Sequence, residues 1–168
     1  MNKQIDIQLT EEDIAIIKDC VKEINSPNCY LEIGVFEGGS ASVALEVAKP
    51  EVELYGIDII DNFKLKDTRF NFINKPSLEV AKDWNKPIGV LFIDGNHDCA
   101  GEDFLAWDKF VVKGGYILFH DYALHSPLVI KQCDELVRSN GNYKVLFTPK
   151  LIKNHGDPNT SILKVIKL

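Results

Sequence analysis

Residues 29–40 read CYLEIGVFEGGS, a short apolar run followed by a glycine-rich turn. The run is too short for a buried helix and stops at Gly34, so it predicts a buried β-strand. Helical periodicity returns over residues 41–49, and residues 53–58 form a second short apolar run that ends at Asp58. Strand, glycine turn, helix and strand in this order predict a parallel β-α-β unit.

The same alternation continues along the chain. Further strands are predicted at 70–74, 88–93 and 116–119, with helices at 77–84, 101–112 and 126–140, the helix at 101–112 being stopped by Gly114-Gly115. Two last apolar runs, at 142–148 and 161–166, have no helix between them and should pair antiparallel across the loop 149–160. The predicted fold class is α/β: a doubly wound, mostly parallel seven-stranded sheet with a C-terminal antiparallel hairpin and helices on both faces.

A first helix precedes this unit. Thr10 and Asp13 have the spacing of a capping box, in which each side chain binds a free backbone amide at the helix start. An apolar stripe follows at helical spacing up to Ile24, and Ser26-Pro27-Asn28 ends it. We expect one domain over residues 1–168, with an N-terminal helical segment at 1–27 and the core at 28–168.

Composition narrows the function classes. The 168 residues are 45% hydrophobic and 26% charged, which is typical of a globular protein, and no run approaches the ~20 apolar residues of a membrane span. The net charge is −6 and no basic stripe is visible, so neither a nucleic acid nor a membrane is an expected partner. The N-terminal sequence has no apolar signal core and the four cysteines are scattered, so we expect a reduced, cytoplasmic protein.

Polar side chains stand at the predicted carboxyl ends of four strands: Glu32, Asp58, Asp94, and the pair His120-Asp121. In doubly wound sheets, ligands bind outside the carboxyl ends of the strands, where the strand order reverses. The first loop adds Gly34 and Gly38, and Asp58 follows 20 residues after Gly38, where a carboxylate accepts ribose hydroxyls. The alternative is a tight turn that binds no ligand.

The pattern Glu32-x-Gly34-x-x-x-Gly38-x-Ser40 resembles motif I of the class I S-adenosylmethionine methyltransferases, which have a Rossmann-like sheet. It departs from the GxGxxG of dinucleotide-binding proteins. The resemblance implies that the loop wraps the methionine part of S-adenosylmethionine, that Asp58 binds the ribose and that Ser77 meets the adenine. The cofactor-binding residues it implies are Glu32, Gly34, Gly38, Ser40, Asp58, Ser77 and Asp94.

A second pattern is Phe-Ile-Asp-Gly-Asn-His at 92–97, followed by Gly114-Gly115 and by His-Asp-Tyr at 120–122. It is similar to small metal-dependent O-methyltransferases related to those that act on antibiotic sugars. The resemblance, over about residues 28–125, implies that Asp94 and Asp121 hold a divalent cation such as Mg²⁺. It also implies that His97 is the general base, so that Asp94 and His97 are the catalytic residues. The expected reaction is S-adenosylmethionine-dependent, metal-assisted O-methylation of a small molecule or sugar.

Simpler roles stay open for these residues. Asp94 and Asp121 are also suited to binding backbone amides in their loops, and His97 to lining the pocket. His120 stands where relatives have an acid, and it is either a metal ligand, a partner of the ligands or a packed side chain. Trp84 and Trp107 are expected to be packing groups. Two other functions remain: a non-catalytic cofactor-binding or assembly protein, and a nucleotide-dependent oxidoreductase.

The short chain restricts the substrate site. Seven strands nearly use up 168 residues, which leaves 59–69, 149–160 and the region from His120 to Pro127 to surround a substrate. The alternative source of a wall is a second copy of the chain, so a homodimer is a further expectation.

Overall fold

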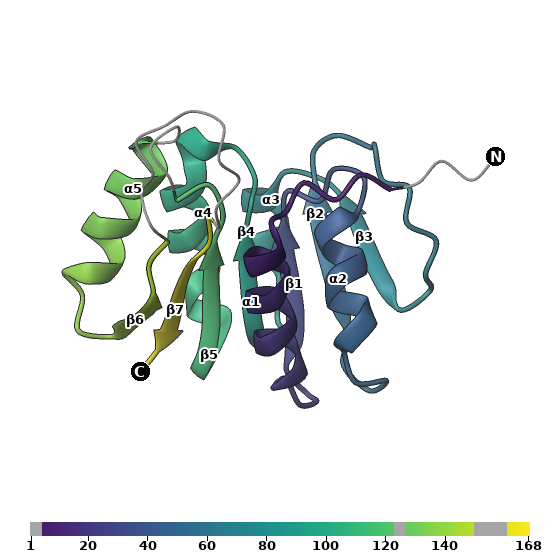
Figure 1. Cartoon of the computed structure of the whole chain (residues 1–168), viewed down its shortest axis with the longest axis horizontal. Helices are drawn as coiled ribbons and strands as arrows, with labels where there is room; N and C mark the ends of the chain where they lie inside the picture. The colour runs from purple at the N-terminus through teal and green to yellow at the C-terminus, as the bar shows by residue number, and fades with distance from the viewer. Residues whose placement is uncertain (1–4, 123–126, 150–160) are drawn as a thin grey trace.

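The computed structural model describes residues 5–122, 127–149 and 161–168. Its seven strands form one sheet in the order β3-β2-β1-β4-β5-β7-β6 (Figure 1). Their bounds are β1 Cys29–Ile33, β2 Leu54–Asp58, β3 Phe70–Asn74, β4 Ile88–Ile93, β5 Val111–Phe119, β6 Tyr143–Phe147 and β7 Leu163–Lys167. β7 pairs antiparallel with both β5 and β6, and the other pairs are parallel.

Helices cover both faces of this sheet (Figure 1). Their bounds are α1 Glu11–Lys22, α2 Gly39–Val47, α3 Ser77–Asp83, α4 Ala100–Trp107 and α5 Pro127–Cys133, the last continuing as a π-helix over Asp134–Arg138. Alternate residues of each strand face opposite layers, because side chains along a strand alternate in direction. Tyr30 and Phe92 pack in the layer of α1 and α2, whereas Leu31 and Ile93 pack with α4 and α5. The predicted fold class is confirmed.

The first helix begins as the sequence predicts. The Thr10 hydroxyl accepts a hydrogen bond from the Asp13 amide, and the Asp13 carboxylate accepts one from the Thr10 amide. Ile17, Cys20 and Val21 are fully buried against α2 and the sheet. This helix is therefore part of the core layer rather than an appendage.

The prediction of a helix over residues 101–112 is wrong at its C-terminal end. α4 ends at Trp107, a 3₁₀ turn covers Asp108–Phe110, and β5 already begins at Val111. Gly114 and Gly115 lie inside this strand, where the pairing of β4 with β5 is irregular and Gly114 has φ +80°. Two consecutive β-branched valines favour the strand, and the glycines allow it to bulge, so they do not stop a helix.

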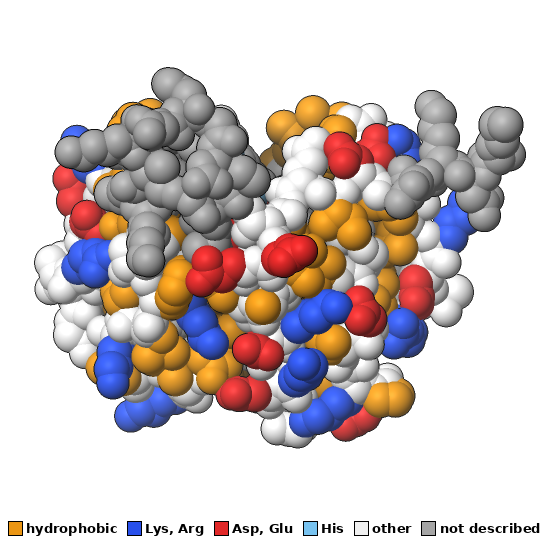
Figure 2. Space-filling view, in the orientation of Figure 1, with side chains coloured by type: hydrophobic (Ala, Val, Ile, Leu, Met, Phe, Trp, Pro, Cys, Tyr) orange, Lys and Arg blue, Asp and Glu red, His pale blue; other side chains and the backbone are white. Residues whose placement is uncertain are grey.

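The strand order reverses between β1 and β4, since β2 lies on one side of β1 and β4 on the other. The connections that follow β1 and β4 therefore run in opposite directions, and a crevice opens between them at the carboxyl ends of these strands. Figure 2 shows acidic and basic side chains interspersed over the face that carries α1 and α2. Among the described residues, no helix combines the length and apolar character that a membrane crossing requires. The predicted helix start at Ser126 and most of the loop 149–160 lie outside the described residues.

Candidate functional site

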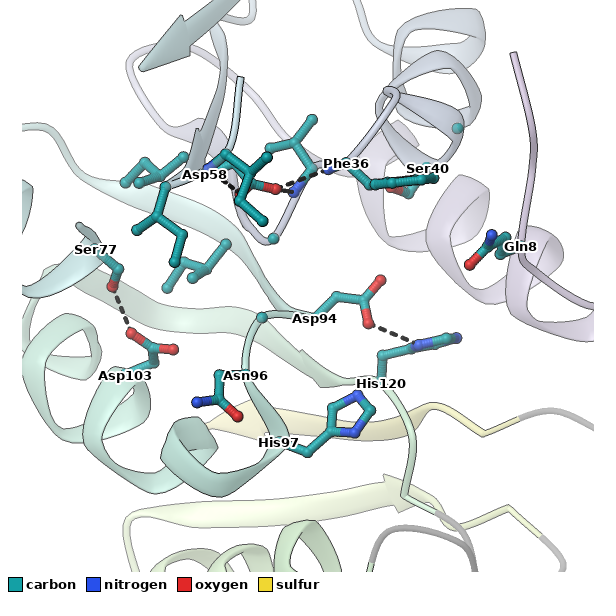
Figure 3. A pocket seen from close by; sticks show the side chains of 18 of the residues that line it. Gln8, Phe36, Ser40, Asp58, Ser77, Asp94, Asn96, His97, Asp103 and His120 are labelled. Atoms are coloured by element: carbon teal, nitrogen blue, oxygen red, sulfur yellow. Dashed lines mark hydrogen bonds and ion pairs between the residues drawn. The ribbon is translucent and has the colours of Figure 1, made fainter. Parts of the chain in front are cut away.

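A cavity of about 620 Å³ occupies this crevice (Figure 3), a size usual for a small-molecule site. It is lined by the carboxyl ends of the strands, the first loop, and Asp6, Gln8 and Leu9 from the N-terminal segment. The predicted site residues that line it are Gly34, Ser40, Asp58, Ser77, Asp94, His97 and Asp121. Glu32 and Gly38 do not line it. Sequence reasoning missed several other polar lining side chains, among them Gln8 and Asp103.

Gly34 lets the chain turn off β1 at the bottom of the cavity. Its φ is +85°, and a β-carbon there would lie 2.2 Å from the carbonyl oxygen of Asp94. Only glycine permits both the left-handed conformation and this approach of the two strand ends. Gly38, at the start of α2, also has a left-handed φ of +98°, and a β-carbon there would lie 2.9 Å from Cβ of Leu65. Both glycines therefore shape the loop.

Asp58 holds the same loop in place. Its Oδ2 accepts hydrogen bonds from the backbone amides of Val35 (3.0 Å) and Phe36 (2.9 Å). Its Oδ1 accepts one from the amide of Ile60 at 2.9 Å. The predicted ribose-binding carboxylate is thus already oriented by three backbone donors, and one acceptor site is left on Oδ1, because each carboxylate oxygen accepts about two hydrogen bonds.

Glu32 lies beneath the loop and is fully buried. The hydroxyls of Tyr30 and Ser40 both donate hydrogen bonds to its carboxyl group. Burial raises the pKa of Glu32 to about 8, although these two hydrogen bonds oppose the shift. Its position links β1 to the first turn of α2, so it braces the loop from below.

Asp94, His97, His120 and Asp121 come together at the ends of β4 and β5. Figure 3 shows the first three of these side chains. His120 Nδ1 lies 2.8 Å from Asp94 Oδ1 and 3.4 Å from Asp121 Oδ2. His97 Nε2, from the 3₁₀ turn His97–Cys99, lies 2.6 Å from Asp121 Oδ2. One ligand atom each from Asp94, His97 and Asp121 lies within 4.8 Å of the others. The sequence-predicted acids and base are therefore neighbours in space.

The electrostatics of this cluster are set by burial and by the two carboxylates. Desolvation raises the pKa of Asp94, and the nearby His120 opposes that shift. Desolvation favours the neutral form of His120, but the carboxylates of Asp121 and Asp94 outweigh it and raise its pKa to about 10. His120 lies between the two acids, and of its three predicted roles the geometry favours a partner of the ligands.

Asp121 is held in an uncommon backbone conformation. Its φ is +54°, which costs energy for any residue with a β-carbon, although Asp tolerates it better than most. Its amide donates to the Ser161 hydroxyl (3.3 Å), and the amides of Ser161 and Ile162 donate to Asp13 Oδ1 at 3.1 and 3.3 Å. The buried capping carboxylate of α1 thus fixes the start of β7, which supports Asp121. Asp13 carries a capping-box signal in the sequence, but nothing local indicates this second role.

Ser77 sits on the other side of the cavity, at the start of α3. Its hydroxyl donates a hydrogen bond to Asp103 Oδ1 and accepts one from Trp107 Nε1 at 2.9 Å. Burial raises the pKa of Asp103, and the hydrogen bond from Ser77 lowers it. Trp107 is fully buried, as expected of a packing group. Asp103 and Trp107 are four residues apart on α4, a spacing that places them on one helix face but does not identify a ligand.

Known proteins share both sequence and fold with this chain. A protein from Acanthamoeba polyphaga mimivirus, described as uncharacterized protein R132, is 32% identical over 82% of this chain and 79% of its own length. The fold matches a Bacillus cereus O-methyltransferase in complex with S-adenosylhomocysteine (SAH), with TM-score 0.76 and 11% identity over 99% of this chain and 84% of the other. It also matches the Streptomyces achromogenes O-methyltransferase TomG in complex with S-adenosylmethionine, with TM-score 0.75 and 12% identity over 95% and 81%.

A protein-family model also matches the sequence. The model described as a methyltransferase domain matches residues 31–122, more than half of the sequence. The matched segment begins in β1 and ends just after Asp121, so it contains the glycine loop, Asp58 and the cluster at the ends of β4 and β5. The chain therefore belongs to the methyltransferase domain family.

Proposed function

We propose that this protein is an S-adenosylmethionine-dependent methyltransferase that methylates an oxygen of a small molecule or sugar with the help of a divalent cation. One observation carries the proposal. The cavity that begins at the glycine loop ends at Asp94, His97 and Asp121, so the cofactor cradle and a set of acid-base groups share one space. A non-catalytic binding protein would need the cradle alone.

The residues of the first loop fit the cofactor. Gly34 and Gly38 have no side chains, so the backbone of the loop can approach a ligand closely. Asp58 presents a carboxylate where a ribose is expected. S-adenosylmethionine supplies an electrophilic methyl group on a sulfonium sulfur. The main task of the chain is then to align this group with a nucleophile, because orientation supplies much of the rate of such a displacement.

The cluster fits a divalent cation. The carboxylates of Asp94 and Asp121 are suitable ligands for a hard cation such as Mg²⁺ or Mn²⁺. Such a cation, when bound, lowers the pKa of a substrate hydroxyl. His97 has a side chain that is 47% exposed and its Nε2 faces Asp121, so the ring is held at the open side of the cluster. There it can accept the proton of the hydroxyl, a common role of histidine.

Binding measurements test the proposal before a substrate is known. We expect SAH to raise the melting temperature of the protein, since a ligand that binds the folded state stabilises it. Mn²⁺ binding, followed by electron paramagnetic resonance, should weaken at least tenfold in Asp94→Asn and Asp121→Asn. Asp98→Asn is the matched control, because Asp98 is an exposed acid next to His97. Absence of any SAH-induced shift would overturn the proposed cofactor, and unchanged Mn²⁺ affinity in both variants would overturn the metal site.

Once a substrate is found, the same variants test the chemistry. Asp94→Asn should lose metal-dependent methyl transfer while it keeps its fold by circular dichroism. His97→Gln should lower the turnover number more than it raises the KM for substrate, because a general base acts in the transition state. SAH binding without any transfer across a broad panel of hydroxylated substrates would favour the non-catalytic alternative.

A further inference from the structure

Tyr122 directly follows Asp121 in the chain, and both its backbone and its side chain are held. Its amide donates a hydrogen bond to the Ser161 carbonyl at 2.8 Å. Its ring is only 3% exposed and packs in the layer of α4 and α5. The hydroxyl at the far end of the ring lies 2.8 Å from Asp134 Oδ1 and 3.3 Å from a terminal nitrogen of Arg138. Tyr122 therefore connects the end of β5 to the π-helix that follows α5.

The hydrogen bonds at this hydroxyl have a fixed direction. The guanidinium of Arg138 can only donate, so the Tyr122 hydroxyl accepts from it. The single proton of the hydroxyl is then donated to Asp134 Oδ1. Arg138 also donates to the same oxygen of Asp134 and to the Thr148 hydroxyl at 3.0 Å, so the two groups that bind Tyr122 are themselves fixed. A π-helical turn such as this one is frequent at functional sites.

Asp121 lies between two neighbours that the fold holds. On one side, the amide of His120 donates to the Ile93 carbonyl at 3.0 Å, which continues the pairing of β5 with β4. On the other side stands Tyr122. Asp121 itself has a φ of +54°, a conformation that persists only where the surroundings impose it. A change of backbone conformation at this residue would turn its carboxylate away from His97 Nε2, which now lies 2.6 Å from Oδ2.

We propose that Tyr122 is a positioning residue of the methyltransferase site, whose hydroxyl holds Asp121 in the conformation that binds the divalent cation. The inference rests on the proposed function. It gives a role to the tyrosine of the His-Asp-Tyr pattern at 120–122, for which the family resemblance implies none. Tyr122 does not line the cavity, so it acts on the cation through Asp121 and not by contact.

The experiment measures Mn²⁺ binding by electron paramagnetic resonance and, without metal, SAH binding by isothermal titration calorimetry. Tyr122→Phe keeps the ring in the core and removes only the hydroxyl. Its Mn²⁺ affinity should fall roughly 3- to 10-fold, the value of one hydrogen bond. Its SAH affinity should stay unchanged, because the glycine loop and Asp58 follow other strands. General damage to the fold would instead weaken both ligands.

Tyr116→Phe is the matched control. Tyr116 lies on β5, and its hydroxyl also donates to a carboxylate, that of Glu23 at 2.6 Å, but neither residue lines the cavity. This variant loses the same kind of hydrogen bond from the same strand. It should bind Mn²⁺ and SAH as the wild type does.

Two substitutions of Asp134 provide an independent test, since its side chain is 44% exposed and tolerates change. Asp134→Ala removes the acceptor of the Tyr122 proton and should weaken Mn²⁺ binding by a factor similar to that of Tyr122→Phe. Combining the two should add no further loss, because both remove one interaction. Asp134→Asn loses the same charge but keeps Oδ1, which accepts from both Tyr122 and Arg138, so its Mn²⁺ affinity should stay near that of the wild type.

Three results would overturn the inference: Tyr122→Phe binds Mn²⁺ as tightly as the wild type, Tyr122→Phe weakens Mn²⁺ and SAH by the same factor, or Asp134→Asn is as weak as Asp134→Ala. The last result would show that the charge of Asp134 acts at long range and that its hydrogen bond does not matter. A wild type that binds SAH but no Mn²⁺ would instead overturn the proposed metal site, and this inference with it.

Discussion

Gly34→Ala tests how the two central strands meet beneath the cavity. The new methyl group would lie 2.2 Å from the Asp94 carbonyl oxygen and 2.7 Å from Cα of Gly95. An ordinary contact is near 3.5 Å, so the strand ends must separate by about 1 Å. The amide of Asp94 donates to the Ile33 carbonyl at 2.8 Å, and this hydrogen bond cannot survive that separation unchanged.

The expected loss of stability can be built from its parts. Left-handed backbone at an alanine costs about 1–2 kcal/mol, overpacking about 1–3 kcal/mol, and a weakened hydrogen bond about 1 kcal/mol. The sum, roughly 3–6 kcal/mol, is a large part of the stability of an ordinary domain. Gly114→Ala is the control, because Gly114 has a similar φ of +80° but a β-carbon there would meet no atom within 4 Å.

Urea unfolding of the two variants separates the effects. Gly114→Ala should lose only the backbone cost of about 1–2 kcal/mol, so Gly34→Ala should be less stable than the control by several kcal/mol. Gly34→Ala should also bind SAH more weakly, since Asp94 moves with its carbonyl group. Equal destabilisation of the two variants would refute the idea that contact between the strand ends, rather than backbone conformation, requires glycine here.

Three other predictions test the supports of the site. Asp13→Ala and Thr10→Ala both remove the capping box, but only Asp13→Ala also removes the acceptor for the amides of residues 161–162. In urea unfolding, Asp13→Ala should lower the free energy of unfolding by about 2–4 kcal/mol and Thr10→Ala by about 1 kcal/mol. Equal losses in the two variants would contradict a stabilising contact between Asp13 and residues 161–162. The raised pKa of Glu32 means that the folded state keeps a proton that the unfolded state releases, so stability falls as the pH rises from about 5 to about 8, by at most about 1.4 kcal/mol per pH unit. Glu32→Gln should flatten this fall in thermal unfolding at several pH values, and an unchanged slope would show that another group causes it. Asp58→Ala leaves the amides of Val35 and Phe36 without their acceptor and should weaken SAH binding more than tenfold, as measured by calorimetry. A variant that binds SAH as tightly as the wild type does would contradict this prediction.

Local sequence patterns predict most of this fold because the strands are buried and short. The run ending at Gly34 and the run ending at Asp94 have no alternative as helices, and each acid that follows a strand is placed at one edge of the sheet by the parallel topology alone. This is why Asp58, Asp94, His97 and Asp121 can be brought to one cavity without a structure. The predicted start of β5 is wrong, because Val111 continues the apolar periodicity of a helix into a strand.

The residues that sequence reasoning missed depend on contacts between distant segments. Asp13 binds the amide of Ser161, 148 residues away, and Asp103 binds Ser77, 26 residues away on another helix. Each of these acids is buried, and burial of a charged side chain is costly unless it is paired. Local patterns indicate only a helix-capping residue and a polar position on a helix. The tertiary packing decides which residue each buried acid contacts, and the hydrophobic periodicity of the sequence does not indicate it.

The aspartates in and behind the cavity fall into two classes according to their hydrogen-bond partners. Asp58 and Asp13 accept hydrogen bonds from backbone amides, and they hold the first loop and the residues before β7 in place. Asp94, Asp103 and Asp121 instead contact side chains, and together with Asp58 they line the cavity. A cavity that keeps carboxylates facing inward attracts cations and hydrogen-bond donors. A sulfonium, an adenine amino group and a divalent cation are all of this kind, which makes the electrostatics of the cavity agree with each part of the proposed chemistry.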